Sequence, residues 1–191
     1  MQIVSYPEAD TPSELRGQVL ALQHEAWPSD DPPDVSALTH DPALRPLSML
    51  LVEDGTVLAA LDILSKEIVH AGRRYASGGL STVVTCRQAR GQGHGRRLVA
   101  AAREAMAASD MDLGLFTCDR PLQGFYESAG WRVIPGAVLV GGTSLSPFPS
   151  DRPGFDKVTM ADFFSAEGRR HQSSFHDSRI ELYPGEIDKL W

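Results

Sequence analysis

The residues from Thr82 to Leu98 read Thr82-Val-Val-Thr-Cys-Arg-Gln-Ala-Arg90-Gly-Gln-Gly-His-Gly95-Arg-Arg-Leu98 and carry the strongest local signal in the chain. An apolar, β-branched run leads into a loop with three glycines, and a helical pattern follows at once. Because the glycines have no side chains, several backbone N–H groups can turn toward one anion. The first turn of the helix adds unpaired N–H groups and the positive end of its dipole. We therefore predict a strand, a pyrophosphate-binding loop and a helix, with three arginines around the loop.

Two widespread anion-binding fingerprints do not fit this loop. The dinucleotide fingerprint G-x-G-x-x-G would need a third glycine at the position of Arg96. A P-loop needs Gly-Lys-Ser/Thr, and no such tripeptide follows. The loop does contain R-x-x-G-x-G, formed by Arg90, Gly93 and Gly95. Short glycine-rich loops also occur as plain turns between a strand and a helix, so the pattern needs support from elsewhere.

A second segment, Gly124-Phe-Tyr-Glu-Ser-Ala-Gly-Trp131, gives that support. It follows the glycine loop with one helix and one strand between them. Together the two segments resemble the cofactor-binding motifs of the GNAT superfamily of N-acetyltransferases, and the resemblance covers roughly Ile3 to Val140. It implies an α/β fold with a mixed, mostly antiparallel central sheet flanked by helices. It also implies acetyl-CoA as cosubstrate and transfer of the acetyl group to an amine.

The resemblance implies roles for particular residues. Val83, Val84 and Thr85 would offer backbone groups to the pantetheine arm, and an amide there would polarise the thioester carbonyl. Tyr126 would be the general acid that protonates the departing thiolate. Packing of Phe125 and Tyr126 against the sheet is the alternative role of this aromatic pair. The loop residues implied in pyrophosphate binding are Arg90, Gly91, Gln92, Gly93, His94, Gly95 and Arg96.

A narrower resemblance concerns the acceptor amine. The hairpin Met49–Leu64, the segment Gly124–Trp131 and the chain end Asp188–Trp191 are similar to aminoglycoside 2′-N-acetyltransferases, whose terminal tryptophan carboxylate faces the antibiotic. Those enzymes carry a glutamate, implicated as a base, in the strand before the cofactor loop, where this chain has Leu80-Ser-Thr-Val-Val84. The residues expected near the substrate are Asp31, Ser81, Thr82, Asp119 and Trp191.

The general base stays open. An amine that arrives partly neutral needs only a water path, and Asp119 could face the substrate or cap the helix at Pro121. The acidic, proline-rich segment 27–46 is either a solvated loop or an acidic wall beside a cationic substrate. The further candidates for the base are Asp30, Asp31, Asp34, the terminal carboxylate of Trp191, His171 and His176.

Composition limits the class of protein. The 191 residues suit one domain, residues 1–191, with an elaborated C-terminal part from about residue 141. A formal net charge of −7 argues against a nucleic-acid-binding surface and mildly favours cationic ligands. Cys86 and Cys118 lie in apolar runs, which predicts buried free thiols, and we expect no metal site. With neither a signal peptide nor a membrane-spanning run, we expect a cytoplasmic protein without a membrane partner; related domains often pair, so a homodimer is one expected state.

Periodicity and turn signals predict the order of elements. The first helix is expected to begin at the capping box Thr11-Pro-Ser-Glu14 and to carry an apolar stripe. Gly78-Gly79 predicts a bulge or bend, and residues 141–154 are expected to form a loop. Two further helices are expected at 95–109 and 121–129. The expected strands are 2–6, 47–52, 56–64, 66–69, 75–86, 112–118, 131–134, 137–140, 157–164 and 179–183.

Two other functions stay open at this point. Acetylation of a protein or peptide needs the same cofactor loop and a more open acceptor groove. A non-catalytic acyl-CoA-binding module would keep the loop and lack turnover. The expected function is acetyl-CoA-dependent N-acetylation of a primary amine in a small cationic substrate, with an aminoglycoside as one candidate.

Overall fold

The computed structural model describes residues 1–29, 37–183 and 190. The chain divides into two compact units. The first comprises Met1–Leu64 and Leu80–Ala102, and the second comprises Ser65–Gly79 and Arg103–Trp191. Two long strands, β3 (Thr56–His70) and β4 (Arg73–Thr85), contribute residues to both units.

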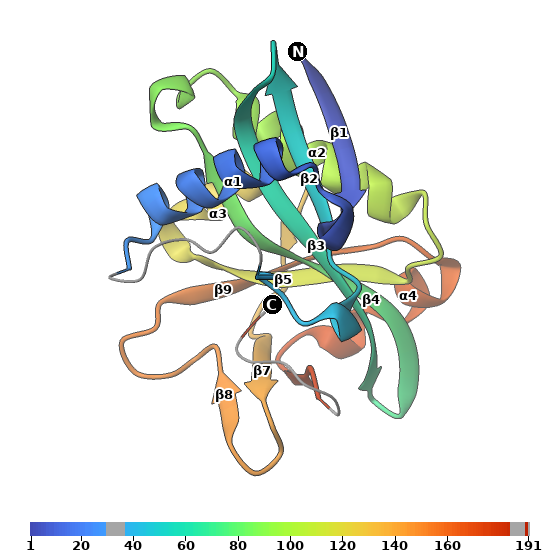
Figure 1. The fold of residues 1–191 in the computed structure, drawn as a ribbon. Helices are drawn as coiled ribbons and strands as arrows, with labels where there is room; N and C mark the ends of the chain where they lie inside the picture. Colours follow the sequence, from blue (N-terminus) through green and yellow to red (C-terminus); the bar gives the residue numbers. More distant parts are fainter. Residues whose placement is uncertain (30–36, 184–189, 191) are drawn as a thin grey trace. The chain divides into compact units, whose positions relative to one another are not determined.

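The first unit begins with an antiparallel arrangement of strands (Figure 1). Strand β1 (Gln2–Pro7) pairs with β2 (Leu47–Glu53), which pairs with β3 across a tight turn. Asp54 and Gly55 form this turn with φ values of 49° and 79°, as the Asp-Gly pair predicts. The remaining elements before β2 are η1 (Glu8–Asp10), α1 (Ser13–Ala26) and η2 (Pro42–Leu44).

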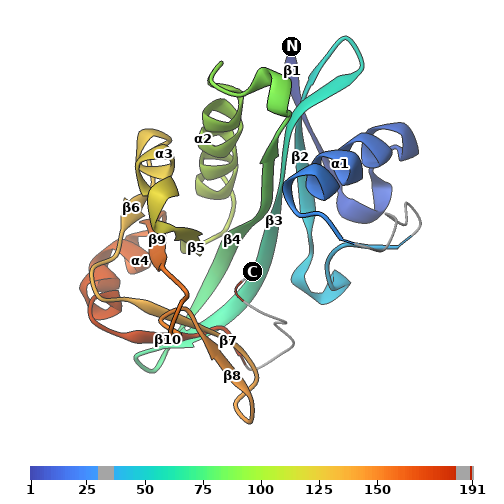
Figure 2. The same ribbon diagram turned by 90° about the vertical axis from the view of Figure 1, so that its left-hand side faces the viewer.

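Helix α1 covers one face of these strands (Figures 1 and 2). Its predicted apolar stripe is confirmed, because those side chains pack against a buried cluster from the strands. The stripe consists of Leu15, Val19, Leu22 and Ala26, and the cluster of Leu50, Val52, Val57, Ala60 and Val84.

The predicted capping box of α1 is wrong. The helix begins at Ser13 after Pro12, and no side chain caps its first turn. The N–H of Thr11 donates to the carbonyl of Glu8 at 3.2 Å, so Thr11 ends the preceding turn η1. Among the described residues, the Oγ1 of Thr11 has no hydrogen-bond partner.

The second unit holds the remaining strands and short helices. Strand β4 pairs in parallel with β5 through Ser77 and Gly78, and β5 pairs in antiparallel with β9 over its whole length. The elements are β5 (Leu113–Asp119), η4 (Arg120–Leu122), α3 (Gln123–Ser128), β6 (Arg132–Val133), β7 (Val138–Gly142), β8 (Pro147–Pro149), β9 (Lys157–Phe163), α4 (Ala166–His171), η5 (Gln172–Phe175) and β10 (Arg179–Glu181).

The hydrogen-bonded strand order is β1-β2-β3-β4-β5-β9-β6 in the larger sheet and β10-β7-β8 in a smaller one. The expected mixed, mostly antiparallel sheet with flanking helices is therefore confirmed. An aromatic cluster fills the core of the second unit, where Phe116 contacts both Tyr126 and Trp131 edge-to-face at 4.9 Å. Gly114 is required beside it, since a Cβ there would lie 2.7 Å from the Trp131 ring.

Three expectations about the elements need correction. The run 66–69 is the continuation of β3 rather than a separate strand. The expected loop 141–154 contains β8, where Phe148 contacts Phe155 edge-to-face and the Leu139 N–H donates to Ser150 Oγ. The polar segment 165–178, for which the sequence indicates no element, forms α4 and η5 around the buried Phe175.

Candidate active site

The glycine loop connects β4 to α2 (His94–Ala107) through the short turn η3 (Arg87–Ala89). Gly91 and Gly93 have φ values of 78° and 83°, which only glycine adopts without strain. A Cβ at either position would meet nothing within 4 Å, so the loop backbone is open to an approaching group. Gly95 already lies in α2 and is buried. The loop therefore suits a pyrophosphate that backbone amides approach closely.

The first backbone hydrogen bond of α2 joins the Arg97 N–H to the Gly93 carbonyl at 2.9 Å. The amides of residues 94–96 therefore form the first turn, whose N–H groups have no partner within a helix. Arg96 is exposed beside this turn. The helix end and its arginine favour an anion at this position.

Side chains of the loop hold it in place. The Arg90 Nε donates to the carbonyl of Thr85 at 3.2 Å, which ties the loop to the end of β4. The Gln92 amide donates to the Gln88 carbonyl at 3.4 Å, and His94 Nε2 lies 3.3 Å from Gln92 Oε1. The predicted loop residues thus form one continuous segment, of which residues 90–93 precede α2 and residues 94–96 form its first turn.

Strand β4 changes conformation at Thr82, whose φ is 48°. A β-branched residue in this region is strained by roughly 1–3 kcal/mol, which surrounding contacts must offset. The Thr82 Oγ1 donates to Asp62 Oδ2 at 2.6 Å. Neither Gly78 nor Gly79 has a positive φ, so the left-handed residue of β4 is Thr82, and a bulge or bend at Gly78-Gly79 stays a prediction.

The neighbours of Thr82 divide into buried and accessible residues. Ser81 and Val84 are buried, and Val84 belongs to the core beneath α1. Val83 and Thr85 are half-buried. At the end of β4, next to the glycine loop, Ser81 and Val84 are therefore held in the core, whereas Val83 and Thr85 are partly accessible.

Asp62 is a functional candidate that sequence reasoning missed. It is buried on β3, and besides Thr82 it accepts the Ser48 hydroxyl at 2.5 Å and lies 3.1 Å from His40 Nε2. The signal in the sequence was a single carboxylate inside the apolar run Thr56–Leu64. Strained backbone such as that of Thr82 clusters at functional sites, and Asp62 is its direct hydrogen-bond partner.

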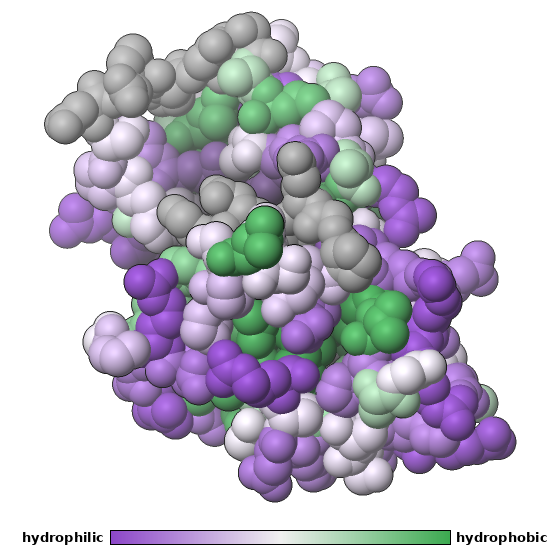
Figure 3. All heavy atoms as spheres, turned by 90° about the horizontal axis from the view of Figure 1, so that it is seen from below, coloured by the Kyte–Doolittle hydropathy of each residue, from purple (hydrophilic) through white to green (hydrophobic). Residues whose placement is uncertain are grey.

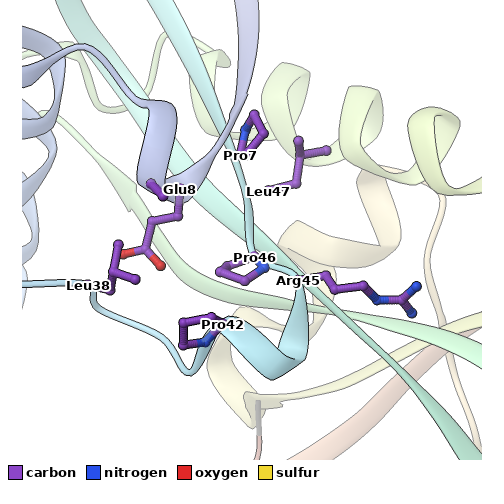
Figure 4. Close-up of a pocket in the computed structure, with 8 residues that line it drawn as sticks. Pro7, Glu8, Leu38, Pro42, Arg45, Pro46 and Leu47 are labelled. Atoms are coloured by element: carbon purple, nitrogen blue, oxygen red, sulfur yellow. The ribbon is translucent and has the colours of Figure 1, made fainter.

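A second carboxylate supports the segment that carries His40. The amides of Thr39 and His40 donate to the buried Glu8 at 2.5 and 3.3 Å, and Arg16 lies 3.6 Å from the same carboxylate. Glu8 also borders a cavity of about 320 Å³ (Figure 4). The cavity is lined by Pro7, Glu8, Ala9, Leu38, Pro42, Arg45, Pro46 and Leu47.

Tyr126 lies on α3 in the second unit and is only 6 % exposed. Its ring contacts Phe116 and Phe125 edge-to-face at 4.9 Å. Burial, followed by the nearby Cys118 and Asp119, raises the pKa of the Tyr126 phenol above its ordinary range. The hydroxyl therefore keeps its proton at neutral pH. The ring contacts of Tyr126 fit a packing role, and its protonated hydroxyl also fits a role as a proton donor.

The other predicted residues are placed as follows. Asp119 pairs with Lys157 at 2.7 Å and does not cap the turn at Pro121, so the capping alternative is wrong. His171 pairs with Glu167 on α4, and the His176 N–H donates to the Ser173 carbonyl, both in the second unit. Asp30, Asp31, Asp34 and Trp191 lie outside the described residues.

Cys86 is partly exposed and Cys118 is buried, and both are free thiols. Within residues 1–29, 37–183 and 190, no group of three or more His, Cys, Asp or Glu is placed to hold a metal ion. No helix in the described part of the chain is long and apolar enough to cross a membrane.

The family model for the acetyltransferase (GNAT) domain matches residues 11–134, a range that includes the glycine loop and Tyr126. The chain belongs to the GNAT acetyltransferase family. No curated protein sequence matches the chain.

Several solved structures share the GNAT fold with this chain. ElaA of Escherichia coli is 16% identical with a TM-score of 0.56, covering 84% of this chain and 97% of its own. An aminoglycoside 6′-N-acetyltransferase complexed with coenzyme A is 14% identical with a TM-score of 0.61, covering 86% and 98%. The NatC complex bound to Gag peptide and coenzyme A includes a chain that is 14% identical with a TM-score of 0.55, covering 86% and 100%. Because such different acceptors share the fold, the fold alone does not select the acceptor of this GNAT protein.

Proposed function

We propose that this GNAT protein is an acetyl-CoA-dependent N-acetyltransferase for a primary amine of a small cationic substrate, with an aminoglycoside as one candidate. The observation that carries the proposal is the open loop with left-handed Gly91 and Gly93, which leads directly into the first turn of α2. The amides of residues 91–96, Arg90 and Arg96 would hold the pyrophosphate of acetyl-CoA.

The end of β4 would hold the acyl arm. Backbone groups of Val83, Val84 and Thr85 would bind pantetheine, and an amide there would polarise the thioester carbonyl. Losing one such donor typically costs about 2.7–4 kcal/mol of transition-state stabilisation. Holding the amine against the thioester supplies much of the remaining acceleration through proximity.

Tyr126 would donate the proton that the leaving thiolate needs. A nearby thiol shows how this environment affects sulfur: burial, followed by the charge of Asp119, raises the pKa of Cys118 to about 11. A thiolate in such surroundings binds a proton more strongly than in water. The pKa of the leaving thiol is therefore closer to the raised pKa of the buried phenol. Tyr126 can therefore act as an acid despite its own raised pKa.

The acidic composition supports a cationic acceptor. Asp and Glu outnumber Lys and Arg by 25 to 18, and the amine of such a substrate arrives mostly as an ammonium ion. Ser81, Thr82 and Asp119 stay candidates for substrate contact. The ion pair of Asp119 with Lys157 makes Asp119 a weaker attractant for a second cation.

The test is release of coenzyme A from acetyl-CoA, followed with a thiol reagent across aminoglycosides, polyamines, amino-acid amides and short peptides. The partly exposed Cys86 contributes a protein background, so Cys86→Ala is assayed beside the wild type. The matched substrates are an aminoglycoside with a free 2′-amine and its 2′-hydroxyl counterpart. Turnover of the first and not the second identifies both the class and the position of attack.

Other outcomes change the proposal in defined ways. Turnover with peptides alone would support protein acetylation instead. Tight binding of acetyl-CoA without turnover of any amine in the panel would contradict the enzyme and favour an acyl-CoA-binding module.

A further inference from the structure

A carboxylate and an imidazole that the proposed reaction has not used lie together in the first unit. His40 Nε2 is 3.1 Å from Asp62 Oδ2, and the two side chains are only 10% and 5% exposed. Asp62 also accepts the hydroxyls of Ser48 and Thr82 at 2.5 and 2.6 Å. A buried carboxylate with three partners is well satisfied and holds its position.

This contact determines which nitrogen of His40 is free to act. A carboxylate accepts hydrogen bonds, so the imidazole places its proton on Nε2 and leaves a lone pair on Nδ1. No described residue forms a hydrogen bond with Nδ1 of His40. The same contact holds the imidazole in one orientation, with Nδ1 on the side of the ring away from Asp62 Oδ2.

The backbone around His40 is fixed independently of Asp62. Glu8 accepts the amides of Thr39 and His40, and Arg16 neutralises Glu8 from the side of α1. Glu8 and Leu38 border the cavity of Figure 4, so the segment that carries His40 lies at the edge of a hollow. His40 itself does not line this cavity, and the position of its imidazole is set by Glu8 through the backbone and by Asp62 through the ring.

Thr82 connects this pair to the cofactor strand. Its hydroxyl binds Asp62, and the next residues along β4 are those proposed to hold the acyl arm, Val83–Thr85. Thr82 forms this hydrogen bond while its backbone is left-handed, a conformation that is unfavourable for threonine. Strain of this kind commonly accompanies a function.

We propose that Nδ1 of His40 accepts a proton from the substrate ammonium, with Asp62 as the positioning residue; this inference rests on the proposed function. One N–H bond breaks toward Nδ1, and the freed lone pair forms the C–N bond to the acetyl carbon. The C–S bond breaks as Tyr126 gives its proton to the sulfur. A second proton from the nitrogen then restores the Tyr126 phenol. His40 returns its proton to water, so the net reaction yields amide, thiol and one proton.

A purely structural role of His40 and Asp62 predicts a different pattern of activity loss. If His40 and Asp62 only join strands β2, β3 and β4 to the segment 37–46, their loss lowers the activity for all amines alike. If they remove a proton, the loss depends on whether the amine carries that proton on arrival.

The experiment compares His40→Gln and Asp62→Asn with wild type on two acceptors, an amine that is protonated at the assay pH and a weakly basic one that is neutral there. The matched controls are His24→Gln on α1 and Asp54→Asn in the β2–β3 turn, where asparagine suits the left-handed backbone. For the protonated amine, we expect kcat/KM to fall about 100-fold or more in both variants, with kcat falling more than KM rises. For the neutral amine, we expect a clearly smaller loss, and both controls should match wild type.

A rescue experiment keeps the proposal falsifiable if folding is affected. His40→Ala should regain turnover of the protonated amine as free imidazole is added, and His24→Ala should not respond. Equal losses for both amines without rescue would overturn the role of His40 and leave the proposed function intact. A wild type that turns over no amine would instead overturn the proposed function, and this inference with it.

Discussion

Tyr126 is the residue whose role can be tested most directly. Tyr126→Phe keeps the aromatic contacts with Phe116 and Phe125 and removes only the hydroxyl. If this hydroxyl protonates the thiolate, kcat should fall by about 10²–10⁴-fold, the usual contribution of a general acid. Binding of acetyl-CoA, measured by calorimetry, should stay within experimental error of wild type.

Tyr75 offers a matched control within the same unit. It is fully buried, its hydroxyl has no hydrogen-bond partner among the described residues, and burial raises its pKa as well. Tyr75→Phe should therefore leave kcat unchanged. A Tyr126→Phe enzyme with wild-type kcat would assign Tyr126 to packing.

Cys118 predicts how stability depends on pH. Its pKa is raised to about 11 in the folded protein, above the ordinary value of about 8.5 for a free thiol. The folded state therefore binds the proton more tightly, and the free energy of unfolding falls as pH rises from about 8.5 to 11. We expect this thiol to account for on the order of 2 kcal/mol of the fall in urea unfolding.

Cys118→Ala distinguishes the titration of this thiol from that of the buried tyrosines. Titration of the tyrosines also lowers the stability of the protein at higher pH, for the same reason. The variant should start less stable at pH 7 because of its cavity, and its stability should decline less steeply above pH about 8.5. Parallel curves for the two proteins would show that Cys118 does not titrate in this range.

At the scale of elements, the glycine loop allows a test of whether its positive φ angles matter for the proposed binding of acetyl-CoA. An alanine at Gly91 or Gly93 meets no neighbouring atom but must adopt a positive φ, at a cost of about 1–2 kcal/mol. We expect each variant to be destabilised by about that amount and to bind acetyl-CoA more weakly. Thermal unfolding with and without acetyl-CoA measures both effects.

Gly17 is a control for the Gly→Ala substitution, because its backbone is helical rather than left-handed. It lies inside α1 with helical backbone and open space at its Cβ. Gly17→Ala should therefore stabilise the protein by about 0.5–1 kcal/mol without changing its affinity for acetyl-CoA. Loop variants that behave like Gly17→Ala would show that the positive φ angles are not required.

Elements with a strong local signal were predictable from the sequence. The stripe of α1, the Asp54-Gly55 turn and the strand–loop–helix unit around Gly93 each depend on neighbours within a few residues. The role of Thr11 and the strand β8 were not predicted, because their local sequence suits more than one structure. The Thr11 N–H donates to the carbonyl of Glu8, so Thr11 ends η1 instead of capping α1, and Pro147–Pro149 form β8 by pairing with β7.

At the scale of the whole molecule, the same reasoning explains which parts of the site the sequence missed. The loop residues are consecutive, so a motif reveals them. The partners of Asp62 lie 14, 20 and 22 residues away, in β2, in β4 and in the segment before η2. Only the fold brings them together, and the sequence could show no more than a carboxylate among apolar residues.

Net charge belongs to the whole chain, and it predicts the response to salt. On the face drawn in Figure 3, hydrophilic residues lie around the hydrophobic patches and are exposed to solvent. With a net charge of −7, the protein should attract polycationic acceptors over distances that salt screens to about 8–10 Å at physiological ionic strength. We expect kcat/KM for a polycationic amine to fall as sodium chloride rises, with kcat unchanged.

Two controls assign this effect to the acceptor. Acetyl-CoA is kept saturating, because salt would also weaken the proposed binding of its phosphates by the basic loop. An amine with a single charge should show a much shallower dependence, since the interaction scales with the charge of the ligand. Equal slopes for the two amines would mean that the acidic composition serves solubility alone, and the preference for a cationic acceptor would then have to come from individual side chains near β4.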